Sequence, residues 1–231
     1  MTDFAALRER MVARDVAARG LNNPLLLAAM RTVPREEFVA PPLAEHAYED
    51  RPLPIEAGQT ISQPYIVALT IDAAGIGAGD KVLEVGAGSG YAAAVIGQIA
   101  GKVIAIERHH ELAELARDRI SRLGYDNVRI VEGDGTRGFP AEAPFDAIVA
   151  AASGRHVPPA LLDQLNPGGR LVMPVGSQLW SQSLVKLTKN HDGTIDREDL
   201  CVVRFVPLIG AQGFSDEGSE AGASLAQNGP D

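Results

Sequence analysis

The fold class of this chain is decided by residues 82–91, which read VLEVGAGSGY. Apolar residues predict a strand over 81–85, the three glycines predict a sharp turn, and the apolar run from Tyr91 predicts a helix. Glycines let a ligand approach the backbone closely, and the N-terminus of the following helix directs its N–H groups at the same place. This order of strand, glycine turn and helix therefore predicts a ligand site at the carboxyl end of a parallel strand.

The runs around this turn alternate between strand-like and helix-like patterns. Further strands are predicted over 102–107, 127–132, 145–150 and 169–175, with helices over 65–74, 91–100, 109–123 and 158–165. This order predicts an α/β fold, a Rossmann-like doubly wound sheet whose strands are mostly parallel. After residue 175, strand-like runs over 183–189 and 195–206 are joined through Asp192-Gly193, so we expect an antiparallel hairpin at one edge.

The segment before the sheet predicts an N-terminal helical extension, because apolar residues recur at helical spacing and Asn23-Pro24 is typical of a helix start. We expect a single domain over residues 1–214. Within it, 1–75 form a helical cap segment and 76–214 form the Rossmann-like core. Residues 215–231 are rich in Gly, Ser and Ala and hold four acids but no Lys or Arg, which predicts a disordered acidic tail.

Composition narrows the function classes. The 231 residues carry 21 Lys and Arg against 30 Asp and Glu, a net charge of −9, so there is no basic excess to bind nucleic acid. No apolar run approaches the roughly 20 residues of a membrane-spanning helix, and the N-terminus does not read as a signal peptide. The single cysteine, Cys201, cannot form an intramolecular disulfide. We therefore expect a cytoplasmic monomer that binds neither nucleic acid nor membranes.

Three acidic residues end three consecutive predicted strands and help to choose among nucleotide ligands. Glu84 lies two residues before the first glycine, where a carboxylate suits the positively charged amino group of S-adenosylmethionine and repels the pyrophosphate of NAD. Glu107 is placed to accept hydrogen bonds from the ribose hydroxyls of either cofactor, and Asp134 to bind the adenine amino group. Acids beside glycines are common in turns, so one alone carries little weight, but the three together favour S-adenosylmethionine.

The chain resembles the bacterial type of protein-L-isoaspartate O-methyltransferase in segments that run through nearly its whole length. Besides the glycine turn, these include VPREEFV at 33–39, GQTISQP at 58–64, GDG at 133–135 and RFVPL at 204–208. The glycine turn is shared with most such methyltransferases, whereas GQTISQP and RFVPL are specific to this family. The resemblance implies a class I S-adenosylmethionine-dependent methyltransferase fold. It also implies that a methyl group moves from S-adenosylmethionine to the free α-carboxylate of L-isoaspartyl residues in damaged proteins, leaving S-adenosylhomocysteine.

The same resemblance implies residue roles. Ser62 is the catalytic residue, and the substrate backbone lies against Val206 and Pro207. The implied cofactor contacts are Gln59, Thr60, Ile61, Ser62, Glu84, Gly86, Gly88, Gly90, Glu107, Asp134 and Gly135. From spacing alone, Ser62 would rather be expected to cap the helix that follows it, and the two roles are compatible. No metal site is expected, because the adjacent His109 and His110 point in different directions on a helix.

The implied chemistry needs no general base. An exposed α-carboxyl group has a pKa of roughly 3.3–3.7 and is already ionised at neutral pH. Catalysis would then come from alignment of the carboxylate with the methyl group, and Ser62 could orient that carboxylate by a hydrogen bond. The net charge of −9 repels an anionic substrate group, so backbone N–H groups near Ser62 and the sulfonium must offset it locally.

The loop over residues 153–156, SGRH, departs from the family pattern of Ala followed by prolines. We expect it to border the active site and to affect peptide preference. Because of this loop, a second function stays open, that of a carboxylate methyltransferase that acts on one dedicated peptide. A non-catalytic S-adenosylmethionine-binding protein and an NAD-dependent dehydrogenase also stay open. A methyltransferase of amide or base nitrogens is disfavoured, because residues 150–153, AAAS, lack the hydrogen-bond acceptors that such enzymes carry there.

Overall fold

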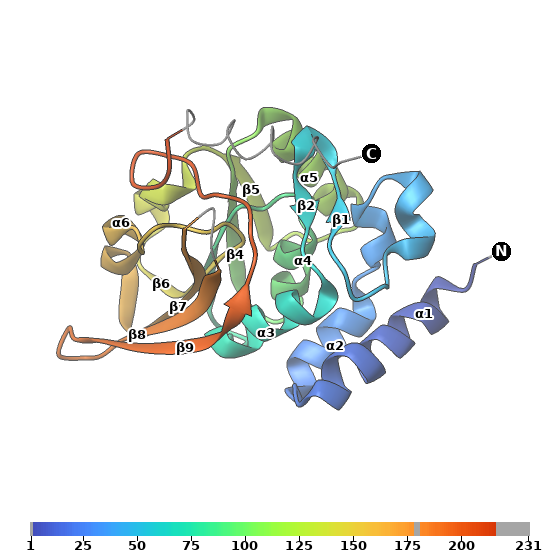
Figure 1. Ribbon diagram of the computed structural model, residues 1–231, viewed down its shortest axis with the longest axis horizontal. Coiled ribbons are helices and arrows are strands. Elements are labelled where there is room, and N and C mark those ends of the chain that lie inside the picture. The colour runs from blue at the N-terminus through green and yellow to red at the C-terminus, as the bar shows by residue number, and fades with distance from the viewer. Residues whose placement is uncertain (1, 178–180, 216–231) are drawn as a thin grey trace, which may run out of the picture.

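The computed structural model describes residues 2–177 and 181–215, so the predicted tail lies outside the described residues beyond Ser215. Within these ranges a seven-stranded sheet has the order β5-β4-β3-β6-β7-β8-β9 (Figure 1). Its strands are β3 Lys81–Val85, β4 Lys102–Glu107, β5 Val128–Glu132, β6 Phe145–Ala150, β7 Leu165–Gly176, β8 Gln182–Lys189 and β9 Ile195–Val203. Strands β3 to β7 are parallel, and β8 and β9 form an antiparallel hairpin at one edge. The predicted α/β fold and its edge hairpin are confirmed.

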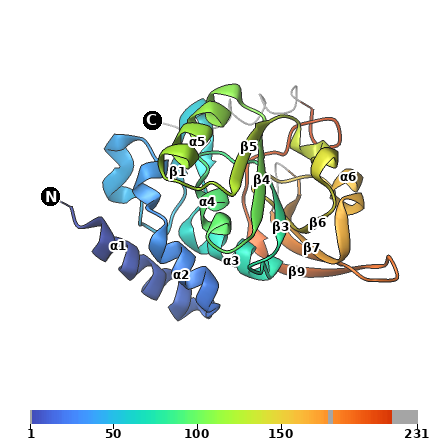
Figure 2. The same cartoon turned by 180° about the vertical axis from the view of Figure 1, so that it is seen from behind.

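Helices cover both faces of this sheet. They are α1 Phe4–Met11, α2 Pro24–Thr32, α3 Pro64–Ala74, α4 Tyr91–Gly97, α5 His110–Arg122 and α6 Pro159–Asp163. One sheet face, which includes Val82 and Ala105, is buried in a cluster with α1 to α5. The other face, which includes Leu83 and Ile106, is buried with α6. Figures 1 and 2 place α1 and α2 at one end of the molecule and the β8–β9 hairpin at the other.

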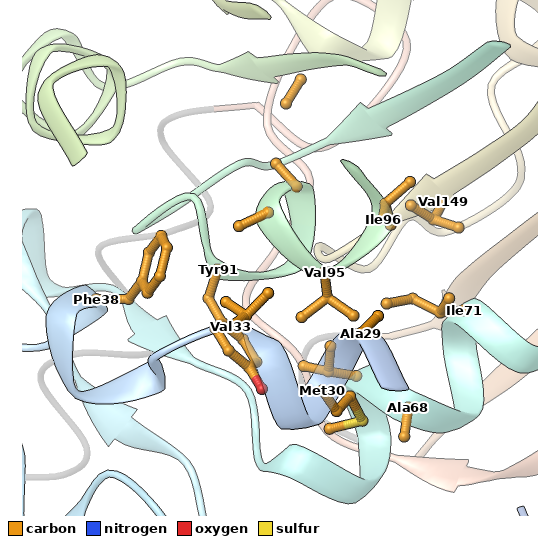
Figure 3. Packing of buried hydrophobic residues seen from close by; sticks show 14 of the residues in the cluster. Ala29, Met30, Val33, Phe38, Ala68, Ile71, Tyr91, Val95, Ile96 and Val149 are labelled. Atoms are coloured by element: carbon orange, nitrogen blue, oxygen red, sulfur yellow. The ribbon is translucent and has the colours of Figure 1, made fainter. Parts of the chain in front are cut away.

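The N-terminal helices and the sheet share one hydrophobic core. Figure 3 shows where α2, α3 and α4 meet: Met30 from α2, Ile71 from α3 and Val95 from α4 lie close together, with Val149 of β6 nearby. All four side chains are buried, and each such burial stabilises a fold by about 1.5–3 kcal/mol. This packing holds α2 and α3 in place relative to α4, the helix that follows the glycine turn.

Caps, glycines and apolar runs in the sequence predicted most helices and strands at the positions that the structure shows. The side chain of Asn23 accepts hydrogen bonds from the N–H groups of Leu25 and Leu26 and caps α2, while Gly20 ends the preceding helical segment at φ +96°. Strands β3, β4 and β6 have the predicted bounds. The largest differences are at three other elements. Helix α4 ends at Gly97 rather than 100, and β9 ends at Val203 rather than 206. Strand β7 begins at Leu165 rather than 169, because Leu165 already pairs with Phe145.

A small second sheet was not predicted. Strand β1, Leu53–Pro54, pairs antiparallel with β2, Thr60–Ile61, and the helical turn Glu56–Gly58 connects them. The N–H of Ile55 also donates to the carbonyl of Gln59 at 2.9 Å. Two-residue strands leave no alternation in a sequence, so this hairpin is visible only in three dimensions. It fixes the segment that leads into α3.

Candidate active site

The described residues enclose a pocket of about 410 Å³ at the carboxyl ends of β3, β4 and β6. From β3 the chain continues to β4 on one side, and β6 lies on the other side, so the pocket lies where the strand order reverses. This is the place where doubly wound sheets bind ligands. The lining comes from the ranges 58–62, 84–89, 106–109, 149–152 and 205–209, from Gly135, and from residues of α3 and α4.

The glycine turn forms one wall of this pocket. Gly86 and Gly88 both have left-handed backbones, with φ of +87° and +53°, and both line the pocket. The N–H groups of Gly86 and Ala87 donate to the carbonyl of Ile106, at 2.8 and 2.9 Å, which joins the turn to the end of β4. The turn therefore brings bare backbone to the pocket surface, where a ligand can approach it closely.

Gly90 does not line the pocket, unlike the other two glycines of the turn. Its φ is +90°, and a Cβ added there would lie 3.4 Å from the Cβ of Ala116 and 3.6 Å from Ile120. The absence of a side chain here allows the start of α4 to pack closely against α5, and the cofactor contact expected for Gly90 stays a prediction. This packing depends on helix–helix geometry that the glycine spacing does not reveal.

Glu84 is the most unusual group in the pocket wall. Its side chain is only 1% exposed, and its Oε2 atom has no hydrogen-bond partner among the described residues. Burial raises the pKa of Glu84 well above its ordinary value, and the neighbouring charge of Glu107 adds to that rise. A buried carboxylate without a partner is costly, so it marks a place where a cationic ligand group would be stabilised.

Glu107 is held rigidly by backbone donors. Its Oε2 accepts from the N–H of Gly88 at 2.8 Å, and its Oε1 accepts from the N–H of His109 at 2.9 Å. Each carboxylate oxygen has about two acceptor positions, so each can still accept a hydroxyl. The end of β4 thus offers two preorganised acceptors inside the pocket, as expected for ribose recognition.

Replacing Glu107 with glutamine should weaken both the glycine turn and cofactor binding. The amide nitrogen cannot accept a hydrogen bond, so the N–H of Gly88 or of His109 loses its acceptor at a cost of about 1–3 kcal/mol. We expect a lower Tm and, by calorimetry, S-adenosylhomocysteine affinity lowered about tenfold for each 1.4 kcal/mol lost. Glu132→Gln is the matched control, because Glu132 pairs in register with Glu107 but is exposed. Unchanged affinity in the Glu107 variant would contradict the assignment.

Asp134 is placed differently from the other two acids. It is not among the lining residues; its Oδ1 accepts from the N–H and hydroxyl of Thr136, and its Oδ2 accepts from the N–H of Ala211 at 2.8 Å. Burial alone would raise the pKa of Asp134, but these hydrogen bonds outweigh burial and lower it. Asp134 thus ties the segment 208–214 to the end of β5, a role that the sequence did not reveal. Its neighbour Gly135 does line the pocket.

Ser62 lies in the pocket wall with Gln59, Thr60 and Ile61, as expected. The hydroxyl of Ser62 makes no hydrogen bond within the described residues, and the cap position of α3 belongs to Gln63. The N–H of Tyr65 in the first turn of α3 instead donates to Asp50 at 3.0 Å. The capping role expected from spacing alone is therefore wrong, and the hydroxyl is free to meet a ligand.

Val206 and Pro207, which lie far from the glycine turn in the sequence, also line the pocket. The carbonyl of Val206 accepts from the N–H of Ser153, and the N–H of Leu208 donates to the carbonyl of Ser153, both at 2.8 Å. Ser153 and Gly154 are buried in bridges to Pro207 and to Val175. The loop 153–156 does not line the pocket itself, but it adjoins the lining residues Ala152 and Val206, so it lies next to the pocket as expected. Its effect on peptide preference stays a prediction.

Sequence reasoning missed the part of the wall that α3 supplies. Ile66, Val67, Thr70 and Ile71 all line the pocket. Their spacing of three to four residues places them on one helical face, and that signal was available in the sequence. His109, in contrast, lines the pocket at the N-cap of α5, whereas His110 points outward to Glu132.

The described residues hold no group of three or more His, Cys, Asp or Glu side chains arranged for a metal ion. Among those same residues, no helix combines the length and apolar character needed to span a membrane.

The comparisons with known proteins agree with this geometry. The family model of Protein-L-isoaspartate(D-aspartate) O-methyltransferase (PCMT) matches residues 7–213. The chain is 56% identical over 214 residues to Protein-L-isoaspartate O-methyltransferase 1 of Rhodopseudomonas palustris (strain HaA2), covering 93% of this chain and 87% of that relative.

Two solved structures are similar over most of the chain. A protein-L-isoaspartate O-methyltransferase superposes with a TM-score of 0.81 at 31% identity, covering 89% of this chain and 67% of that one. A protein from Plasmodium falciparum assigned as a protein-L-isoaspartate O-methyltransferase, in complex with S-adenosyl-L-homocysteine, gives a TM-score of 0.75 at 26% identity. That match covers 90% of this chain and 99% of the other.

Proposed function

This chain belongs to the protein-L-isoaspartate O-methyltransferase family, and we propose that it methylates the free α-carboxylate of L-isoaspartyl residues in the pocket described above. It is an S-adenosylmethionine-dependent protein carboxyl O-methyltransferase. The observation that carries the residue assignment is Glu84, a buried carboxylate with an unpartnered oxygen beside a left-handed glycine turn. Such a wall suits a ligand with a cationic amino group and an adenosine.

The pocket residues fit S-adenosylmethionine. Glu84 would hold the ammonium group, and Glu107 would accept the ribose hydroxyls while it keeps its two backbone donors. Gly86 and Gly88 would leave room for the cofactor at the turn. The remaining proposed contacts are Gln59, Thr60, Ile61, Ser62 and Gly135, with Asp134 proposed to reach the adenine amino group from behind the pocket wall.

When bound, the cofactor supplies a methyl group on a positively charged sulfur. The residues around it have to bind and orient a substrate carboxylate that is already ionised at neutral pH, so no side chain need remove a proton. We propose that the Ser62 hydroxyl donates a hydrogen bond to that carboxylate. The substrate backbone would then lie along Val206 and Pro207, which the hydrogen bonds to Ser153 hold in an extended conformation.

We further propose that the enzyme works as a cytoplasmic monomer on damaged proteins and not on nucleic acid or membranes. Its net charge of −9 supports this, because a strong negative charge favours a soluble monomer and repels phosphate-rich partners. We also propose that residues 1–214 act as one methyltransferase domain. The buried cluster that joins Met30 of α2 to Val149 of β6 supports this assignment.

A panel of peptides separates repair from methylation of one dedicated peptide and from cofactor binding without catalysis. Unrelated sequences that each contain one L-isoaspartyl residue are offered with labelled S-adenosylmethionine. A repair enzyme should methylate all of them with different KM values, whereas an enzyme for a dedicated peptide should methylate one at most. Cofactor binding without methyl transfer to any peptide would contradict the proposal and favour a non-catalytic binding protein.

A further inference from the structure

Arg35 is a charged side chain in the interior that the reaction described so far does not use. It belongs to the 3₁₀ helix Arg35–Phe38, and its side chain is 0% exposed. Among the described residues it forms no ion pair with a carboxylate, and its Nη1 atom has no hydrogen-bond partner. Burying a charge that forms no ion pair costs folding free energy. A role in catalysis would explain why an arginine is kept at this position.

The guanidinium of Arg35 joins three separate segments. Its Nε donates to the carbonyl of Ala47 at 2.7 Å, and its Nη2 donates to the carbonyl of Ser62 at 2.8 Å. Its Cζ lies 4.7 Å from the centre of the Tyr91 ring, within the range of a cation–π contact. Burial lowers the pKa of Arg35, and the interaction with Tyr91 opposes that effect. An arginine side chain in a protein nevertheless keeps its charge.

Two of these three partners belong to the active site. Ser62 is the proposed catalytic residue, and it lies between the end of β2 and the start of α3, outside any regular ladder. Tyr91 is the first residue of α4, directly after the glycine turn, and it also lines the pocket. A single rigid guanidinium therefore sets the position of the Ser62 backbone relative to the wall that carries Gly86 and Gly88.

The charge of Arg35 also has the sign that the substrate requires. The reaction brings an anionic carboxylate next to Ser62 in a chain of net charge −9. The Arg35 guanidinium forms no ion pair with a carboxylate of the described residues and donates to the Ser62 carbonyl. Its charge therefore favours that approach in a low-dielectric interior, and the charge of Asp50 offsets only part of it.

We propose that Arg35 is a positioning residue of the methyl transfer, which holds Ser62 through its carbonyl and favours the substrate carboxylate by its unpaired charge. This inference rests on the proposed function. Arg35 touches neither substrate nor cofactor in it and acts through Ser62. A purely structural arginine would affect folding and cofactor binding instead, so the two roles predict different measurements.

The test compares Arg35→Lys and Arg35→Met with Arg8→Lys, using purified full-length protein and an L-isoaspartyl peptide. Lysine keeps the charge but not the planar fork that reaches two carbonyls at once, so kcat should fall about tenfold or more with little change in KM. Methionine removes the charge as well, so KM for the peptide should also rise. S-adenosylhomocysteine affinity should fall much less than kcat in both. Arg8 is the matched control, because it binds Glu36 and Tyr48 of the same N-terminal segment without touching Ser62.

A double-mutant cycle with Ser62→Ala completes the test. If Arg35 acts through Ser62, Arg35→Lys should lower kcat far less in the Ser62→Ala background than in the wild type, as measured by single-turnover labelling. An equal kcat loss in both backgrounds or an equal loss in Arg8→Lys would overturn the positioning role. So would misfolding of both Arg35 variants, or a loss of S-adenosylhomocysteine affinity as large as the loss of kcat. Failure of the wild-type protein to methylate the peptide would instead contradict the proposed function, so the two failures are distinguishable.

Discussion

Ser62→Ala should lower kcat/KM for L-isoaspartyl peptides by about 10- to 150-fold, because a hydrogen bond to a charged group contributes about 1.5–3 kcal/mol. The hydroxyl lies in the pocket wall with no partner among the described residues, and it does not cap α3. Its removal should therefore leave Tm and S-adenosylhomocysteine affinity close to the wild-type values. Steady-state kinetics with labelled S-adenosylmethionine, together with thermal unfolding, measures both effects.

Ser153→Ala is the matched control for that variant. Ser153 is another serine whose hydroxyl has no partner among the described residues, but it is fully buried and does not line the pocket. Its main-chain hydrogen bonds to Val206 and Leu208 persist in the alanine variant, so activity should not change. Wild-type turnover in Ser62→Ala, or an equal loss in Ser153→Ala, would remove Ser62 from the mechanism.

Glu84→Gln should weaken S-adenosylmethionine binding by about 10- to 150-fold, since it removes the charge from a charge-assisted contact worth about 1.5–3 kcal/mol. It should also remove a pH dependence. In the cofactor-free protein, burial and the charge of Glu107 raise the pKa of Glu84. A bound ammonium group favours the ionised carboxylate, so the pKa of Glu84 must be lower in the complex.

The sign of this pH dependence follows from the two pKa values. Between the pKa of the complex and that of the free protein, binding releases a proton, so affinity rises with pH through this range and levels off above the pKa of the free protein. Calorimetry of S-adenosylhomocysteine in buffers of different ionisation enthalpy counts the released proton. Glu84→Gln should show a flat profile. A flat profile in the wild type would mean that Glu84 does not meet the ammonium group.

The parts of the fold that were predictable from sequence are those built from local patterns. Strand β3, the glycine turn and the start of α4 follow one another within eleven residues, so apolar runs and glycines are enough to locate them. Asn23 capped α2 as expected because a cap acts on its own helix. The ligand site followed as well, since the carboxyl edge of a parallel sheet is determined by strand order.

What could not be predicted depends on contacts between distant segments. Asp134 is engaged by Ala211, 77 residues away, and the first turn of α3 is capped by Asp50 rather than by the adjacent Ser62. Gly90 packs closely against Ala116 and Ile120 of α5. Arg35 lies in the segment VPREEFV, where nothing in the sequence indicates that its side chain is buried and donates to the Ser62 carbonyl. Each of these depends on which distant segment the folded chain brings near, and the periodicity of the sequence does not encode that.

The central claim, that this pocket methylates the free α-carboxylate of L-isoaspartyl residues, is tested most directly with paired peptides. Two peptides of identical sequence, one with L-aspartate and one with L-isoaspartate at a single position, are incubated with the protein and S-adenosylmethionine labelled in its methyl group. Base-labile label on the L-isoaspartyl peptide alone is the predicted result, because a methyl ester hydrolyses in base. No label on that peptide, or equal label on both, would contradict the account.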